Sequence, residues 1–98
     1  DYYGGISDYT KAIEINPQYA KAYYNRGWVK LNLKDYYGAI SDNTKAIEFN
    51  PNDKSFYINR SVAKENIGDI KGACEDAKKA VSLGDTAPYN KSWIRDNC

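Results

Sequence analysis

The chain has 98 residues, with 14 lysines and arginines against 13 aspartates and glutamates, and no histidine. A formal net charge of +1 gives no reason to expect nucleic acid or an anionic membrane as a partner, and no apolar run approaches the ~20 residues of a membrane span. Without histidine, the sequence excludes His-based acid–base sites, Ser-His and Cys-His nucleophile pairs and His-ligated metals. We therefore expect no cofactor and no bound metal.

The first predicted element is a helix over about residues 1–15, which ends at Asn16 because a proline follows. The sequence of this segment is repeated later in the chain: DYYGGISDYTKAIEINP at 1–17 reappears as DYYGAISDNTKAIEFNP at 35–51. A period of this length is too long for one helix and suits a helix pair with its turns. We interpret 1–17 as the second helix of a partial repeat and expect the chain to be a fragment of a longer protein.

Two complete repeats follow, at 20–53 and 54–87, and each is predicted to be a pair of helices. Within the first helix of the pair, AYYNRGWVK at 22–30 aligns with FYINRSVAK at 56–64, and its apolar residues recur at helical spacing. Gly68-Asp69, and Lys34-Asp35 at the equivalent place, mark the turn between paired helices. Pro88 then suits the first turn of a short helix at 88–98, which we expect to cap the stack.

Small residues recur where two helices of this pattern would touch, and large aromatic residues stand between them. Four of these positions, followed by the proline that ends the second helix, are in order Tyr23, Gly27, Ala39, Ala46 and Pro51. With the repeat period they resemble the tetratricopeptide repeat over residues 1–87, and Asn25-Arg26-Gly27 looks like its Asn-Arg-Gly variety. The resemblance implies an all-α solenoid of stacked antiparallel helix pairs, wound into a right-handed superhelix, with a C-terminal capping helix.

A charged pair recurs with the repeat. Asp8 precedes Arg26 in the chain, and Asp42 precedes Arg60 by the same distance. Each arginine occupies a position that is usually apolar in the family. We predict that each arginine crosses from a first helix to the aspartate on the preceding second helix, at a partly buried junction; the alternative is two ordinary surface charges.

The resemblance also implies a concave groove lined by the first helices of the repeats. The exposed groove positions are predicted to be Lys21, Tyr24, Asn25, Trp28, Leu31 and Asn32, followed by Ser55, Ile58, Asn59, Val62, Glu65 and Asn66. Asparagine amides can both donate to and accept from a peptide backbone, and tyrosine and tryptophan offer flat amphipathic contact area. Tyr24 and Trp28 are equally well placed to pack against the preceding second helix.

A more specific peptide site, the carboxylate clamp of chaperone-binding members of the family, is not expected in this chain. FYINRS at 56–61 looks like the central clamp repeat, with Asn59 matching its asparagine. The flanking repeats should supply lysine, asparagine and arginine, but Tyr24 and Trp28 stand on one side and Tyr89 and Trp93 on the other.

Two cysteines are too few for a disulfide framework. Cys74 takes the place of Ile6 and Ile40 in the repeat, which favours a small buried apolar role. A disulfide with Cys98 forms only if the cap folds back onto the second helix of the last repeat, and the sequence leaves this open.

The first helix lacks its partner helix, so its stripe of Tyr2, Ile6, Tyr9 and Ile13 is expected to be partly uncovered. We predict either self-association through residues 1–15 to give a homo-oligomer or a longer natural protein that supplies the missing helix. The compartment is unknown, and cytoplasmic is the default expectation.

The leading interpretation is a non-catalytic protein–protein interaction module that binds an extended peptide or a partner helix in its concave groove. The alternative is an architectural segment of a longer repeat array that mainly self-associates. An enzyme is the weakest interpretation, because the sequence shows no paired carboxylates, phosphate-cradling glycine loop or activated nucleophile.

Overall fold

The computed structural model describes the backbone of residues 1–98 and every side chain except those of residues 88 and 89. The described backbone forms six α-helices and no strand. Their bounds are α1 Tyr2–Ile15, α2 Ala20–Asn32, α3 Tyr36–Phe49, α4 Lys54–Asn66, α5 Ile70–Ser82 and α6 Pro88–Asn97. None of these helices combines the length and apolar character that a membrane crossing requires.

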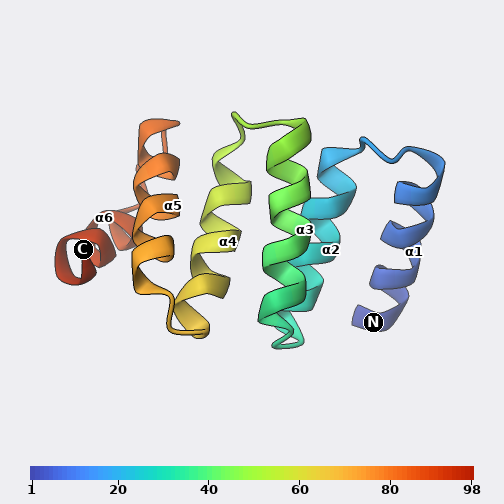
Figure 1. Cartoon of the computed structure of the whole chain (residues 1–98), viewed down its shortest axis with the longest axis horizontal. Coiled ribbons are helices and arrows are strands. Elements are labelled where there is room, and N and C mark those ends of the chain that lie inside the picture. Colours follow the sequence, from blue (N-terminus) through green and yellow to red (C-terminus); the bar gives the residue numbers. More distant parts are fainter.

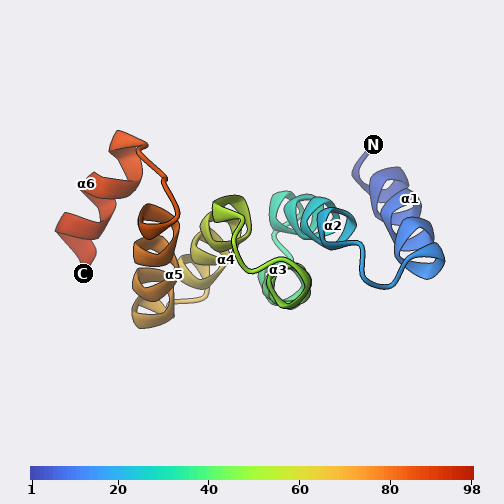
Figure 2. The ribbon, with the colours of Figure 1, turned by 90° about the horizontal axis from the view of Figure 1, so that it is seen from above.

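Consecutive helices lie side by side in chain order, so the molecule is elongated, with extents of 40 × 25 × 19 Å (Figure 1). Seen from above, α2 and α4 form one layer and α3 and α5 form the other (Figure 2). The all-α solenoid implied by the family resemblance is confirmed. The final helix, α6, packs on α5 and closes the stack at the end opposite α1 (Figure 2).

Aspartates begin most of these helices. The side chain of Asp35 accepts a hydrogen bond from the Gly38 amide at 3.0 Å, and Asp69 accepts one from Gly72 at 2.9 Å. These bonds satisfy amide groups that the first turn of a helix leaves without partners. The same start signal, one repeat apart, therefore sets equivalent beginnings for α3 and α5.

Alanines fill the contacts between helices. Ala39, Ala46, Ala63, Ala73, Ala77 and Ala80 are completely buried, which lets the helix backbones approach closely. Phe56 is the largest fully buried side chain, and the neighbouring Tyr57 is also buried, with its hydroxyl donating to the carbonyl of Pro51 at 2.8 Å. The core is thus thin and lies between the two layers of helices. The outer sides of the first helices α2 and α4 therefore remain at the surface.

The predicted ion pairs connect the wrong helices. Arg26 pairs with Asp42, on the following helix α3 of its own hairpin, and the Nη2–Oδ1 distance is 2.7 Å. Arg60 pairs in the same way with Asp76 on α5 at 2.8 Å. The expected partner Asp8 is exposed. The contact of Arg26 with α1 is instead a hydrogen bond, in which its Nη1 group donates to the hydroxyl of Thr10 at 3.2 Å.

Each buried aspartate receives a second cation that the sequence analysis did not assign. Lys30 lies 3.1 Å from Asp42, and Lys64 lies 3.0 Å from Asp76. The hydrogen bond to Asp42, the largest cause, raises the pKa of the Arg26 guanidinium above its ordinary value. One turn separates each lysine from its arginine, so the repeated Arg-x-x-x-Lys spacing indicates that the two cations share a helix face, but not which aspartate they meet.

A disulfide joins Cys74 of α5 to Cys98, and the two Cα atoms are 5.8 Å apart. The possibility that the sequence left open is therefore realised. The capping helix α6 is also held by the indole of Trp93, whose Nε1 donates to Glu65 at 3.1 Å. The side chain of Tyr89, which stands where a carboxylate clamp would need a basic residue, lies outside the described residues.

Candidate peptide-binding groove

A shallow groove of about 350 Å³ runs between α2 and α4 on the surface formed by the first helices. We define the groove by its lining residues, which are Tyr24, Trp28, Leu31, Ser55, Ile58, Asn59 and Val62. All seven are positions that the sequence analysis assigned to the concave surface. The helical period brings them together because both helices present the same register positions to one side.

Two aromatic residues form the α2 wall. Trp28 remains 47% exposed, and its ring meets the ring of Tyr2 of α1 edge to face, with centroids 6.4 Å apart. Tyr24 is half-buried and packs on Phe56 of α4, with centroids 5.2 Å apart. Each ring therefore has an aromatic packing contact as well as a surface in the groove, and the contact of Trp28 is with the preceding second helix.

Burial affects the chemistry of Tyr24. Removal from water, followed in size by the negative charge of Asp53, raises the pKa of its hydroxyl above the usual value. The Nζ of Lys21 lies 5.0 Å from the centroid of the Tyr24 ring, a cation–π contact at the edge of the groove. The phenol therefore stays neutral at physiological pH and offers a hydrogen-bonding group beside an apolar face.

Asn59 is the polar centre of the groove. Its side chain is only 5% exposed, and its Nδ2 has no hydrogen-bond acceptor among the described residues. An unpaired buried amide donor costs free energy, and such groups in folded proteins call for an explanation. Ser55 and Asn59 lie one turn apart on α4, so both face the same side. The groove therefore combines apolar walls with an asparagine whose amide nitrogen is buried beside it and unsatisfied.

The remaining predicted groove residues are not among those that line it. Lys21 is exposed at its edge, and Asn25 is half-buried. Asn32 and Asn66 are exposed, and each amide donates to a carbonyl of its own helix, at 2.8 Å in both cases. Among the side chains that the structure describes, no three carboxylate or sulfur ligands converge on a point where a metal could sit.

Comparison with known proteins shows which families and structures this chain resembles. The family profile described as tetratricopeptide repeat matches residues 20–53. No sequence among the curated proteins matches the chain. Among solved structures, the Arabidopsis OM64 TPR domain is similar with a TM-score of 0.92 and 27% identity, over 97% of this chain and 78% of that one.

Two further structures extend the comparison. The first TPR of Spaghetti (RPAP3), bound to the HSP90 peptide SRMEEVD, has a TM-score of 0.92 and 23% identity, over 97% of this chain and 75% of that one. The UNC-45 chaperone has a TM-score of 0.86 and 32% identity over 98% of this chain, which spans 11% of its length. Together these findings define an all-α solenoid of tetratricopeptide-type hairpins, with one repeat matched at 20–53.

Proposed function

We propose that this chain is a non-catalytic interaction module that binds an extended peptide in the groove between α2 and α4. The observation that carries the proposal is the Asn59 amide, which is buried among groove residues with its Nδ2 unpaired in the described part of the chain. The Nδ2 has almost no exposed surface in the free chain, so the Asn59 side chain would turn toward the groove on binding and donate to a carbonyl of the peptide backbone. Similar solved TPR domains that hold HSP90 or HSP70 peptides support peptide binding as the class of activity.

The chemistry of the groove favours a peptide with apolar side chains over an acidic tail. The peptides in those two similar complexes, SRMEEVD and SGPTIEEVD, both end in two glutamates, valine and aspartate. None of the seven residues that line this groove is basic, and Lys21 stands only at its edge. Trp28 offers a large exposed ring that an apolar side chain would cover.

The test is a peptide array probed with the purified chain and with three variants. Trp28→Ala removes an exposed wall, and Asn59→Ala removes the unpaired amide, so both are expected to weaken retained peptides about tenfold or more. The matched control is Tyr37→Ala, because Tyr37 is an exposed aromatic residue of α3, outside the groove. An array with no retained peptide, or equal losses for Tyr37→Ala and Trp28→Ala, would contradict the proposal.

The recurring asparagines give a finer version of the same test. Asn25 and Asn59 occupy equivalent positions of the two repeats, and Asn25 is half-buried beside the groove. We expect Asn25→Ala to weaken the same peptides as Asn59→Ala, by a smaller factor. The proposed membership of the Asn-Arg-Gly variety rests on Asn25, Arg26 and Gly27.

A second candidate function is association with another helix through α1. No residue of α1 is buried, and Tyr3 and Ile15 are 74% and 86% exposed. We propose that an uncovered face on α1 pairs with a second copy or with another helix of a longer array. Sedimentation velocity over a range of concentrations tests the first branch. Monomer at every concentration would exclude it, and Ile13→Lys should abolish any association seen.

A further inference from the structure

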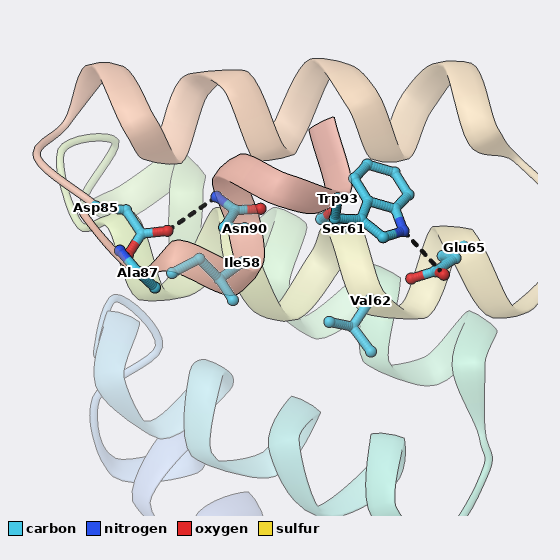
Figure 3. Close-up of a pocket in the computed structure, with 8 residues that line it drawn as sticks. All are labelled: Ile58, Ser61, Val62, Glu65, Asp85, Ala87, Asn90 and Trp93. Carbon is cyan, nitrogen blue, oxygen red and sulfur yellow. Dashed lines mark hydrogen bonds between the residues drawn. The ribbon is translucent and has the colours of Figure 1, made fainter. Parts of the chain in front are cut away.

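A second cavity adjoins the groove, on the other side of α4. This cap pocket has a volume of about 110 Å³. It is lined by Ile58, Ser61, Val62 and Glu65 of α4, by Asp85 and Ala87 before α6, and by Asn90 and Trp93 of α6 (Figure 3). Ile58 and Val62 line both the groove and the cap pocket. The groove and the cap pocket are therefore neighbours, with these two residues between them.

The hydrogen-bond donors of the cap pocket are already used. Ser61 donates to the carbonyl of Ala73 at 3.0 Å, and Trp93 donates to Glu65 at 3.1 Å. The amide of Asn90 donates both to Asp85 at 2.8 Å and to the carbonyl of Ala77 at 3.3 Å. The free hydrogen-bonding capacity of the described lining is therefore on acceptor oxygens, and those of Glu65 and Asp85 are carboxylate oxygens, which cannot donate when ionised.

The charge of Asp85 is not balanced within the described part of the chain. Asp42 and Asp76 are 3% and 4% exposed, and each contacts one arginine and one lysine. Asp85 is 7% exposed, yet its contacts are the Asn90 amide and the backbone N–H of Ala87 at 3.3 Å. Buried carboxylates are normally paired with a cation. Glu65 adds a second negative charge at the other end of the pocket in Figure 3.

We propose that the cap pocket binds a basic side chain, of the lysine type, supplied by the peptide that lies in the groove. The methylene stem would lie against Ile58, Val62 and the Trp93 ring, and the ammonium would contact Asp85. Long basic side chains commonly bury their stems along apolar surface in this way. This inference rests on the proposed function, because it assigns the chemistry of one ligand side chain at the same groove.

The size of the pocket fits this occupant. An apolar cavity of about 150 Å³ holds a benzene ring, so a pocket of about 110 Å³ matches a linear alkyl chain. An acidic side chain would meet two carboxylates of its own sign. A neutral aliphatic side chain would fill the same space and leave Asp85 without a cation. Charge complementarity therefore selects the basic side chain from these three.

The test uses n-butylammonium as a probe that carries the lysine side chain alone. The chain has two tryptophans, so its two indole N–H signals in NMR report separately on Trp93 in the pocket and Trp28 in the groove. We expect n-butylammonium to shift the Trp93 signal saturably and to leave Trp28 unmoved. Neutral n-butanol should bind about fivefold more weakly and n-butyrate not measurably. Equal responses to all three probes, or no shift of Trp93, would overturn the proposal.

Two variants locate the charge. Asp85→Asn should abolish the preference for ammonium over n-butanol. Because Asp85 also supports the start of α6, Glu65→Gln is the second variant: its amide oxygen still accepts from Trp93, and the loss of charge should weaken n-butylammonium several-fold. The matched control is Glu75→Gln, an exposed carboxylate of α5 that does not line the pocket. Unchanged ammonium binding in both pocket variants contradicts the assignment of the charge partner.

The peptide array separates this inference from the proposed function. Retained peptides that lose binding when their lysines are replaced by norleucine support both. Retained peptides that tolerate this replacement overturn the basic-side-chain site and leave groove binding intact. An array without retained peptides contradicts the proposed function, whereas the n-butylammonium titration still decides the chemistry of the cap pocket.

Discussion

The two repeats, 20–53 and 54–87, differ in which of their two helices carries the larger side chain at one contact inside the hairpin. In the first, Gly27 of α2 faces the fully buried Asn43 of α3, and a Cβ on Gly27 would lie 2.7 Å from the Asn43 Nδ2. In the second, the equivalent residues are Ser61 and Ala77, so the larger side chain is on the other helix. A small residue on one helix is matched by a larger polar residue on its partner.

The hydrogen bond moves with the larger side chain. Asn43 donates to the carbonyl of Ala39 on its own helix at 2.9 Å. Ser61 donates across the hairpin to the carbonyl of Ala73, the equivalent residue, at 3.0 Å. The second repeat thus gains a bond between helices, whereas the first retains a buried Oδ1 on Asn43 that has no donor among the described residues. The packing in each repeat depends on a pair of residues. We therefore expect a change at one position of the pair to require a change at the other.

The largest expected effect comes from the feature that both repeats share. Asp42→Ala leaves Arg26 and Lys30 without their anion, and Asp76→Ala does the same to Arg60 and Lys64. We expect each substitution to lower the free energy of unfolding by ~3–5 kcal/mol, measured by urea denaturation. Similar losses would show that the repeats are equivalent at this site.

A double-mutant cycle sharpens that comparison. Arg60 and Asp76 should show strong coupling, whereas Arg60 and Asp42 should show coupling near zero, because Arg60 contacts Thr44 and not Asp42 on α3. Strong coupling between Arg60 and Asp42 would contradict the contacts described above and restore the pairing expected from the sequence.

The next effect concerns Ile40 and Cys74, which are equivalent in the two repeats. Cys74 ties α6 to α5 through Cys98, 24 residues away in sequence. We expect reduction by a dithiol, or Cys98→Ser, to lower stability by ~2–3 kcal/mol, with the loss concentrated in α6. Hydrogen exchange measures this. Unchanged protection of α6 after reduction would show that the contacts of Trp93 and Asn90 are sufficient.

Exchange of the packing pair gives a smaller effect. Gly27→Ser forces a side chain against Asn43, with an expected cost of ~2 kcal/mol. The double variant Gly27→Ser with Asn43→Ala copies the second repeat, and we expect it to recover to within ~1 kcal/mol of the parent protein. Thermal unfolding of the four proteins of the cycle provides the measurement, and additive losses would show that the two positions are independent.

The smallest effect is a gain. Lys34 and Gly68 follow the first helices of the two repeats, and both adopt left-handed backbone conformations, with φ of 65° and 84°. A side chain makes this conformation costly, so Lys34→Gly is expected to stabilise the protein by ~1 kcal/mol. The reverse change, Gly68→Lys, should cost about as much. A loss of stability in Lys34→Gly would show that the turn of the first repeat is held by other contacts.

Local features of the sequence were sufficient to predict the helices. The repeat period, the turns at Lys34-Asp35 and Gly68-Asp69 and the prolines after Asn16 and Asn50 act over a few residues, and observed helix ends lie beside each of these turns and prolines. The seven residues that line the groove were predictable for a related reason. Repeated register positions on successive first helices must face one side once the hairpins stack in order.

The cap pocket was not predictable in this way. The pocket depends on how α6 packs after a non-repeating segment. It also depends on the hydrogen bond from Asn90 to Asp85, which lies at the beginning of α6. No repeat period covers those residues. The side chains that close the pocket therefore come together through tertiary contacts alone.

By itself, the amino-acid sequence determined that the chain is a series of helix pairs, because its repeat period is too long for one helix and suits a pair with its turns. It did not determine which aspartate each arginine meets. Asp8 precedes Arg26 and Asp42 follows it at a similar distance, and both are on helices next to α2. Only the tertiary structure decided for Asp42, because the hairpin buries that carboxylate against α2 and leaves Asp8 in solvent.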